Sequence, residues 1–413
     1  MVDEDSGAFD VVVVGGGLAG ASLASVLARA GLDILVLERE VQFRDRVRGE
    51  WLAPWGLVEL EALGLRQVAE SVSGSNLITK HVAYDDAWTS DEAEADVLEM
   101  EGVVPGGGCL GLSHPDFQEA MLANAVTEGA TVVRGTRTVE VDPGTSPTVR
   151  YEADDEATTV GCRLVVAADG RESQIRKGLG IELESTVPQF MMGGMLVEDT
   201  HDWPSDRQST GVSGNFHFLV FPQADNRVRL YGGWDVKDAR RFTGPDRRER
   251  FLESFRMACL PIPGALADGR PAGPLAAYQM TDTWTDVVAS NGVVLIGDAA
   301  GWSDPVIGQG MAVTFRDVHM VSDIITNEIG WSSSAFGSYA KERRERMRRL
   351  RFASAAGYLR HGLDENGAAQ RRRFRAAFAE NPGANPAASA LLGAWFLPEE
   401  AYSDEAWNAL KSI

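Results

Sequence analysis

The chain has 413 residues, of which 44% are hydrophobic and 24% are charged, and its formal net charge is −21. This composition is typical of a globular protein with one or two domains and a sizeable core. The acidic balance opposes binding to nucleic acid or to an anionic membrane surface, because both need clustered basic side chains. No apolar run reaches the roughly 20 residues of a membrane-spanning helix, so the sequence predicts no integral membrane segment.

The N-terminus and the cysteines indicate the compartment. Residues 1–6 are acidic and lack the basic region that begins a secretory signal. Cys109, Cys162 and Cys259 are odd in number and do not have the spacing of metal ligands. These features predict free thiols in a reducing cytoplasm and no metal site.

The first motif joins an apolar strand to a helix through a glycine turn. Val11–Val14 leads into residues 15–20 (GGGLAG). In such a turn Gly15 permits the tight reversal, Gly17 lets the backbone approach a pyrophosphate, and Gly20 lets the helix pack against the strand. The helix N-terminus then presents free N–H groups and its positive dipole end to the phosphates.

An acidic residue, Glu38, closes the next predicted strand, 34–37. A carboxylate at this distance from the turn accepts hydrogen bonds from a ribose diol, and an acid rather than an arginine favours the unphosphorylated ribose of FAD or NAD. The turn and this strand end therefore predict dinucleotide contacts at Gly15, Gly17, Leu18, Ala19, Gly20, Glu38 and Arg39.

Two later predicted strands also end in a turn that contains glycine and aspartate. The predicted strand 164–168 leads into Asp169-Gly170, and the predicted strand 293–296 leads into Gly297-Asp298. A dehydrogenase that binds NAD would complete its sheet soon after the first βαβ unit and would not need these later motifs. The long insertion before Asp169 and the two repeats therefore favour FAD over NAD.

Together these segments resemble the three motifs of the class A flavoprotein monooxygenases, the family that includes p-hydroxybenzoate hydroxylase. The resemblance covers residues 9–330 in the right order and spacing. The middle motif of the family reads Asp-Gly, then Ser, then Arg, and is matched by Asp169, Gly170, Ser173 and Arg176. The resemblance implies that this segment contacts both FAD and NAD(P)H, the expected co-substrate.

The third motif, residues 297–311, implies the flavin contacts. By resemblance Asp298 binds the ribitol or ribose, Gly297 is a further cofactor contact, and Pro305 lies beside the isoalloxazine ring. Residues 308–311 would begin a helix directed at the pyrimidine end of the ring, where a helix N-terminus stabilises the anionic reduced flavin. The expected catalytic, flavin-shaping positions are Pro305, Gly308 and Gly310, with Met311 as a further cofactor contact.

Residues 46–50 (RVRGE) stand where the family places an arginine near the FAD pyrophosphate. Arg48 is the better candidate and Arg46 the second, because a guanidinium there offsets the diphosphate charge with forked hydrogen bonds. Residues 49–54 and 304–306 also resemble the flavin-dependent halogenases and the geranylgeranyl reductases. The Trp-x-Trp-x-Ile-Pro segment of the halogenases is missing, and Gly301-Trp302 replaces the His of many phenol hydroxylases.

The predicted fold is α/β: a Rossmann-like FAD-binding domain of the glutathione-reductase type, an inserted antiparallel β-sheet substrate domain and a helical C-terminal region. Strands 216–221 and 228–233 are expected to form a hairpin. Residues 77–112 suggest irregular structure, and helices are expected over 245–260 and 310–327. The expected division assigns 1–80, 100–182 and 283–345 to the FAD-binding domain, 81–99 and 183–282 to the substrate domain, and 346–413 to the helical region.

The resemblance implies a FAD-dependent monooxygenase that uses NAD(P)H and O₂, through a flavin hydroperoxide, to hydroxylate or epoxidise a hydrophobic, aromatic or polycyclic small molecule. The alternatives are a FAD-dependent C=C reductase, a flavin-dependent halogenase and a flavin-binding protein without catalysis. A cytoplasmic monomer or homodimer is expected. The candidate substrate contacts are Phe216, Phe218, Tyr231, Trp234 and Met192, followed by Phe221, Met191 and Met195.

Overall fold

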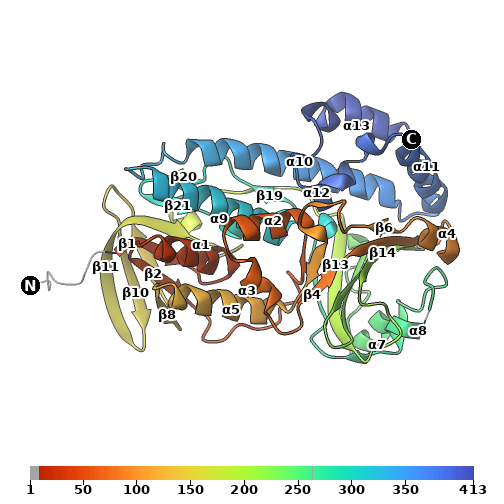
Figure 1. Cartoon of the computed structure of the whole chain (residues 1–413), viewed down its shortest axis with the longest axis horizontal. Coiled ribbons are helices and arrows are strands. Elements are labelled where there is room, and N and C mark those ends of the chain that lie inside the picture. Colours follow the sequence, from red (N-terminus) through yellow and green to blue (C-terminus); the bar gives the residue numbers. More distant parts are fainter. Residues whose placement is uncertain (1–8, 263) are drawn as a thin grey trace, which may run out of the picture.

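The structure is a computed structural model that describes residues 9–262 and 264–413. Two large sheets lie toward opposite ends of the long axis, and helix α10 (Gly337–His361) runs along both (Figure 1). Helices α11 (Gly367–Glu380) and α13 (Asp404–Lys411) lie at the end that contains the second sheet. The expected mixed α/β fold is confirmed. Over the described ranges no helix has both the length and the apolar character needed to cross a membrane.

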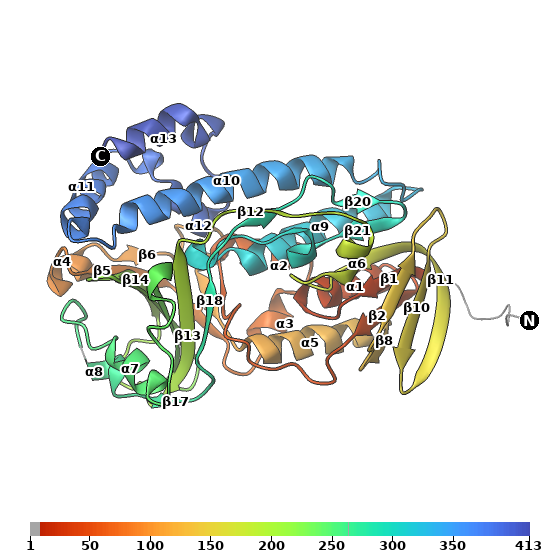
Figure 2. The same ribbon diagram turned by 180° about the vertical axis from the view of Figure 1, so that it is seen from behind.

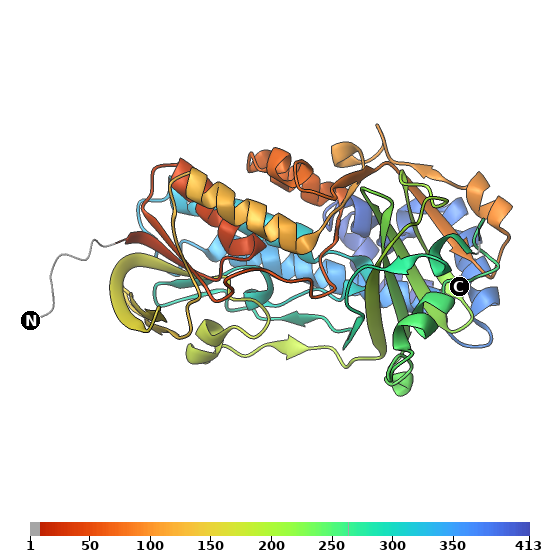
Figure 3. The same ribbon diagram turned by 90° about the horizontal axis from the view of Figure 1, so that it is seen from below.

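The first sheet has a parallel centre. Its strands in spatial order are β20 (Ala289–Ser290), β21 (Val293–Leu295), β11 (Glu156–Ala167), β1 (Phe9–Val14), β2 (Ile34–Glu38) and β8 (Thr131–Arg134). The central strands are nearly continuous runs of Val, Ile and Leu because both of their faces are covered. Val11, Val12 and Val13 are fully buried. Helices α1 (Leu18–Arg29) and α5 (His114–Thr127) pack side by side on one face (Figure 3).

Strand β11 contains most of the predicted strand 164–168 but begins much earlier, at Glu156. It is one strand of 12 residues that changes partner along its length. Through Gly161 it pairs antiparallel with β10 (Thr148–Ala153), which in turn pairs with β9 (Val139–Asp142). From Cys162 onward it pairs parallel with β1. The burial of its residues changes along the strand, from mostly exposed near Glu156 to fully buried near Ala167.

The second sheet is mainly antiparallel. Its strands in order are β17 (Arg270–Pro271), β13 (Phe190–Glu198), β16 (Arg227–Asp235), β15 (Phe216–Gln223), β14 (Arg207–Ser213), β5 (Lys80–Asp85) and β6 (Leu98–Glu99), with β18 (Ala276–Gln279) beside β13. The expected hairpin is present as β15 and β16. Asp225 and Asn226 have φ values of 63° and 54°, the two left-handed residues that a tight hairpin turn requires.

Two sequence interpretations of this region are wrong. Residues 77–112 are not irregular, because they supply β5 and β6 to the second sheet and, with β3 (Trp51–Leu52), contribute β4 (Asn76–Ile78) and β7 (Cys109–Gly111) to a small third sheet. These strands are short, and the acidic helix α4 (Ser90–Ala95) lies between them in the sequence, so no regular alternation of apolar residues was evident. The helix expected over 245–260 is only α7 (Arg247–Glu253).

Helix α10 is joined to the first sheet by buried charges, which we call the Asp317 network: Asp317, Arg343 and Arg346. Asp317 lies on α9 (Gly310–Asn327), is fully buried, and accepts hydrogen bonds from Arg343 Nε at 3.0 Å and Arg346 Nη2 at 2.7 Å. It also accepts from the backbone N–H of Gly297 at 2.9 Å. The network therefore fixes two helices to the loop that follows β21.

The remaining donors of Arg343 hold the same loop. Its Nη1 donates to the carbonyl of Ala300 at 2.8 Å, and its Nη2 donates to the carbonyls of Gly301 at 2.8 Å and Gly297 at 3.1 Å. The expected domain boundary between residues 345 and 346 consequently falls inside one continuous helix. The first turns of α10 bind the loop of the first sheet, and its last turns reach the second sheet (Figure 2).

We expect Arg343→Met to lower the free energy of unfolding by about 3–5 kcal/mol, because it leaves the buried Asp317 with one fewer cation and three carbonyls without their donor. The matched control is Arg344→Met on the same helix. Arg344 pairs with Asp286 at 2.9 Å, and both side chains are more than half exposed. Its loss should change stability by less than about 1 kcal/mol. Urea unfolding of both variants measures the difference, and equal effects would contradict the assignment.

Candidate active site

The glycine turn after β1 sets the N-terminus of α1 at the edge of the first sheet. Gly15 has φ 102°, and a Cβ on it would lie 2.4 Å from the carbonyl oxygen of Ala168. A Cβ on Gly20 would lie 1.9 Å from the carbonyl oxygen of Gly15. Both positions require glycine because backbone packs against backbone there. Gly17 is the N-cap of α1 and provides no side-chain hydrogen bond, so the first N–H groups of the helix are available to an anion.

Glu38 ties this turn to the end of β2. Its Oε2 accepts a hydrogen bond from Gly16 N at 2.7 Å and its Oε1 accepts from Glu40 N at 2.6 Å. Each oxygen keeps a second lone pair, so the carboxylate is still able to accept from a hydroxyl group. Leu18 and Ala19 lie in the first turn of α1. The side chain of Arg39, in contrast, is 73% exposed, beside Glu40.

The middle motif caps a short helix, α6 (Gln174–Gly178), and is linked to the third motif. Asp169 Oδ2 accepts from the backbone N–H groups of Gln174 and Ile175, while its buried Oδ1 has no hydrogen-bond partner among the described residues. Gly170 makes the turn with φ 77°. Arg176 Nη1 donates to the carbonyl of Ala299 at 3.0 Å, so its guanidinium holds two motifs together through backbone oxygens.

Arg171 is a residue of the middle motif to which the sequence assigned no role. Its Nε lies 3.1 Å from Asp298 Oδ2, and its guanidinium lies 5.0 Å from the centre of the Trp302 ring. Asp298 therefore projects from the tight turn η3 (Gly297–Ala300), which the Asp317 network fixes, toward the middle motif. The ion pair joins the two loops at the carboxyl ends of neighbouring parallel strands β11 and β21.

A cavity of about 950 Å³ lies between these loops and the second sheet. Pro305, Gly308, Gly310 and Met311 all line it. Gly308 has φ 67°, and a Cβ there would lie 2.7 Å from the ring of Trp51. Gly310 begins α9, which has no side-chain cap, and a Cβ on it would meet no described protein atom within 4 Å. The third motif therefore presents small residues and a helix N-terminus to the cavity.

The sheet wall of the cavity requires a correction to the predicted substrate contacts. Successive side chains of a strand point to opposite faces. On β15 the side chains of His217, Leu219 and Phe221 line the cavity. Phe216 and Phe218 point the other way, into the second hydrophobic core against α7. Apolar residues occur on both faces of β15. The alternation of side chains along the strand therefore could not show which face lines the cavity.

The other predicted contacts divide in the same way. Tyr231 and Met192 line the cavity. Trp234, Met191 and Met195 belong to the second core, where Trp234 packs edge-to-face on Phe242. Sequence reasoning also missed the cavity residues Trp51, His81, Tyr278, Arg360 and His361, which come from short strands and from the end of α10.

Tyr231 contacts a buried carboxylate at the cavity wall. Its hydroxyl donates to Glu50 Oε2, and burial beside this carboxylate raises the pKa of Tyr231 well above its usual range. Arg229 Nη2 lies 3.4 Å from Glu50 Oε1 and 2.8 Å from Asp45 Oδ2. These residues join the second sheet to the loop that contains Arg48.

The two arginines of that loop differ in their surroundings. Arg46 is 54% exposed and pairs with Glu40 at 2.6 Å. Arg48 lines the cavity, and its buried Nε has no hydrogen-bond partner among the described residues. Burial and the neighbouring Arg171 lower the pKa of Arg48. The preferred candidate is thus the arginine that faces the site with unused hydrogen-bonding capacity.

Two buried aspartates hold the turn that contains Pro305. Asp304 N donates to Asp282 Oδ1 at 2.8 Å, Asp304 Oδ1 accepts from Val306 N at 2.9 Å, and Asp304 Oδ2 accepts from Tyr358 OH at 2.7 Å. Burial raises the pKa of Asp304 to about 6. Burial, together with the neighbouring Asp304, raises the pKa of Asp282 to about 7.

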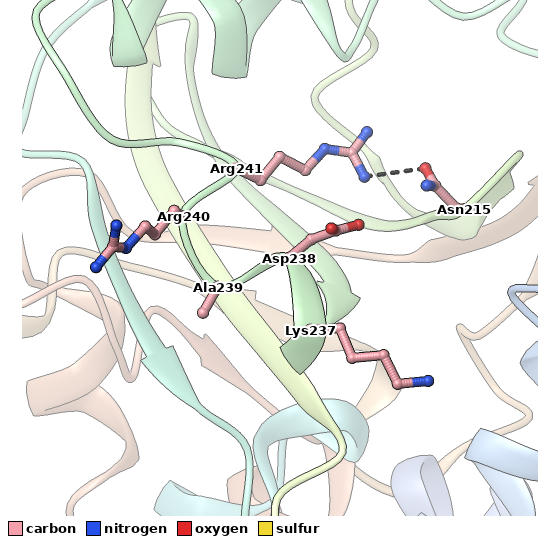
Figure 4. Close-up of a pocket in the computed structure, with 6 residues that line it drawn as sticks. All are labelled: Asn215, Lys237, Asp238, Ala239, Arg240 and Arg241. Carbon is pink, nitrogen blue, oxygen red and sulfur yellow. Dashed lines mark hydrogen bonds between the residues drawn. The ribbon is translucent and has the colours of Figure 1, made fainter.

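A second depression, lined by Asn215 and Lys237–Arg241, lies between the turn that joins β14 to β15 and the segment that follows β16 (Figure 4). Arg241 Nη1 donates to Asn215 Oδ1 at 2.9 Å across it. None of the three motifs contributes to this depression. Across residues 9–262 and 264–413, no group of three His, Cys, Asp or Glu side chains is placed to hold a metal ion. The large cavity is therefore the candidate active site.

The aspartate pair predicts a pH dependence of stability. The folded pKa of Asp282, about 7, lies above the ordinary value of 3.8, so the folded protein binds more protons than the unfolded chain between these values. Stability contributed by this group is therefore largest at low pH and is lost as pH rises through about 7, by at most about 1.4 kcal/mol per pH unit.

We expect Asp282→Asn to stabilise the protein at pH 8 and to flatten the change in unfolding free energy between pH 8 and pH 5.5. Asparagine keeps the acceptor for Asp304 N but has no charge. Urea unfolding at the two pH values measures this, with Asp286→Asn, at an exposed position, as the control. An Asp282→Asn variant with the pH slope of the unaltered protein would show that this carboxyl does not titrate in the range.

Comparison with known proteins agrees with this geometry. A family model described as FAD binding domain matches residues 8–353. The chain is 28% identical to digeranylgeranylglycerophospholipid reductase 2 of Methanopyrus kandleri over 321 residues, covering 73% of each protein. It is 25% identical to squalene epoxidase of Schizosaccharomyces pombe over 334 residues, covering 77% of this chain and 69% of the epoxidase.

The fold is also that of a solved flavoprotein. Klebsiella pneumoniae HpxO, crystallised with FAD and uric acid, superposes with a TM-score of 0.75 at 19% identity, covering 94% of this chain and 97% of HpxO. The family match spans the glycine turn, the middle motif and the third motif. The protein therefore belongs to the FAD-binding family of flavoprotein oxidoreductases that includes the class A monooxygenases, and its cofactor is FAD.

Proposed function

We propose that this enzyme is a monooxygenase that uses NAD(P)H and O₂ to hydroxylate or epoxidise a hydrophobic, aromatic or polycyclic small molecule. The observation that carries the proposal is the continuous cavity that Pro305, Gly308 and Gly310 share with Tyr231 and Met192. FAD bound there would supply the redox chemistry that hydride acceptance and O₂ activation require. The protein supplies orientation, charge stabilisation and exclusion of water.

The described residues fit FAD. In this proposal the uncapped N-terminus of α1 binds the pyrophosphate, and Arg48 contributes its unused guanidinium donors. Glu38 accepts from the ribose, and Asp298 contacts the ribitol. The first sheet with α1 and α5 is then the Rossmann-like FAD-binding domain, and the second sheet is the substrate domain. We keep the expected ranges for the division of the chain, except that α10 crosses the boundary between the FAD-binding domain and the helical C-terminal region.

The third motif would shape the reaction. The uncapped N-terminus of α9 at Gly310 opens onto the cavity, where its dipole stabilises negative charge on a reduced ring. The stacked pair Trp51 and Phe221, with centroids 5.5 Å apart, forms an apolar wall. Leu391 and Leu392, from α12 (Ser389–Leu392), line the cavity from the C-terminal region. An apolar enclosure limits the entry of water to the oxygen-transfer step.

The named relatives support a hydrophobic substrate and define the alternative. Squalene epoxidase is named for oxygenation of a hydrocarbon, whereas the Methanopyrus relative is named for reduction of an isoprenoid lipid. A FAD-dependent C=C reductase is therefore the second candidate function, and a flavin-dependent halogenase is the third. An apolar cavity is compatible with all three functions. Whether an oxygen atom from O₂ enters the product distinguishes the monooxygenase from the other two.

The function is tested by turnover of FAD-loaded protein with NADH or NADPH and a panel of aromatic and polycyclic compounds under ¹⁸O₂. We expect one compound class to accelerate NAD(P)H oxidation and to give a product with one labelled oxygen atom. A control without reduced nicotinamide should give none. A product that gains two hydrogens under anaerobic conditions would replace this proposal with the reductase, and a halide-dependent product would replace it with the halogenase.

The two arginines near the expected pyrophosphate provide a separate test of cofactor binding. Arg48→Met should weaken FAD binding about tenfold or more, which corresponds to about 1.4 kcal/mol, because a charge-assisted contact is lost. Arg46→Met should leave the FAD dissociation constant within about twofold, because Arg46 is exposed and paired with Glu40. Titration of the apoprotein with FAD, followed by flavin fluorescence, measures both constants. A larger effect of Arg46→Met would reverse the assignment.

A further inference from the structure

We propose that the substrate carries an acidic group, a carboxylate or a phosphate, and that Arg360 binds this group where α10 meets the second sheet. The inference rests on the proposed function, because it names the chemical class of the molecule that enters the same cavity. Arg360 lies in the last turn of α10 and lines the cavity. Figures 1 and 2 both show this end of α10 over the second sheet, beside α11.

The charge of Arg360 lacks a balancing carboxylate. Within the described ranges, no Asp or Glu oxygen lies within 4.0 Å of its guanidinium, and its hydrogen bond is to His361 Nε2 at 3.3 Å. Arg371, nearby on α11, pairs instead with the buried Asp85 at 2.8 Å and also with Asp86. Arg360 is partly buried, and an anion would offset the cost of withdrawing part of its charge from water.

The end of helix α10 does not supply that anion. The carbonyl groups of His361 and Gly362 accept hydrogen bonds from Arg371 Nη1 at 2.9 and 2.7 Å. The negative end of the helix dipole therefore interacts with Arg371 and does not compensate the charge of Arg360. Arg360 is left as a cation that faces the cavity, in a position where a ligand oxyanion would neutralise it.

The neighbouring histidines do not compete for the anion as charges. His217 and His361 stack with ring centroids 4.1 Å apart, and His361 Nε2 accepts from Arg360. Burial and the charge of Arg360 lower the pKa of His217 to about 3 and that of His81 to about 4. Arginine remains protonated. Near neutral pH, the positive charge of this histidine-rich end therefore rests on Arg360.

His81 adds a neutral donor. The indole N–H of Trp51 is only a donor, so the oxygen of Gln208 must be the atom that accepts from it. The amide nitrogen of Gln208 then donates to His81 Nδ1 at 3.2 Å. This fixes the His81 proton on Nε2, for which the described residues provide no acceptor. An arginine fork with a nearby imidazole N–H suits an oxyanion with several lone pairs.

The rest of the wall makes the expected ligand amphipathic. Leu219, Phe221 and Tyr278 line the same cavity as Arg360 and favour an apolar body. Arginine binds a carboxylate and a phosphate with the same forked geometry. The structure therefore does not distinguish these two acidic groups, and each is tested with its own compound.

The test measures binding, so it does not depend on oxygen transfer. FAD-loaded protein is titrated with biphenyl-4-carboxylate, dodecanoate and dodecyl phosphate, and with the methyl esters of the two carboxylic acids, while the flavin spectrum is followed. We expect at least one acid to bind tenfold or more tightly than its ester. Comparison of dodecanoate with dodecyl phosphate identifies the preferred oxyanion. Arg360→Met should abolish the preference while the ester affinity changes less than twofold.

Two variants separate recognition from a structural role. Arg360→Lys keeps the charge and should retain part of the preference, and Arg344→Met, on the exposed side of the same helix, should retain all of it. Arg360→Met should also keep or raise the thermal unfolding midpoint, because an uncompensated, partly buried cation is removed.

Equal binding of acids and esters, or absence of binding by every acid, would overturn the proposal. So would an Arg360→Met variant that retains the acid preference, whatever its unfolding midpoint. An acid preference without oxygen incorporation would overturn the monooxygenase assignment alone and leave the role of Arg360 standing.

Discussion

The buried contact of Asp317 with Arg343 and Arg346 is the constraint on which the site depends. It lies between α9, α10 and the loop after β21, and the arginine donors satisfy loop carbonyls that would otherwise be buried without partners. A tight turn with satisfied carbonyls can direct Asp298 outward to Arg171 and place α9 with its N-terminus at the cavity. The same pair of helices thus fixes both the third motif and the path of α10.

The cavity exists because α10 is long enough to reach both sheets. Parallel strands place their loops at one edge of the first sheet, and this is where ligands bind in open α/β structures. The second sheet turns one face to those loops and covers its other face with α7 and the aromatic cluster around Phe216. The C-terminal region completes the enclosure through residues such as Leu392. The walls of the cavity therefore come from three separate parts of the chain.

Charge is distributed unevenly around this cavity. At the end formed by the middle and third motifs, Arg171 is paired with Asp298, and Arg229 is paired with Asp45. At the end of α10, Arg360 faces the cavity without such a partner among the described residues. Arg48 also lines the cavity without an ion pair among the described residues, but it lies in the loop after β2, away from the end of α10. A low-dielectric enclosure strengthens a charge interaction, so the uncompensated charge of Arg360 favours entry of an amphipathic ligand with its acidic group toward α10.

The sequence alone determined the features that depend on local chemistry. Glycines such as Gly15 and Gly20 are required where backbone meets backbone, so they identify the turn, the helix after it and the cofactor class without knowledge of distant contacts. The sequence also predicts the turns at Asp169 and Asp298, each of which follows an apolar strand. It predicts α9 as well, and the predicted range 310–327 matches the structure.

Only the tertiary structure decided which sheet face encloses a cavity and which charges are compensated. Phe216 and His217 are neighbours on an alternating strand, and their opposite roles depend on α7 covering one face and α10 the other. Arg343 and Arg360 lie on one arginine-rich helix, but the first is paired with Asp317 and the second is not. Burial and pairing arise from segments far apart in the chain, so no local pattern contains them.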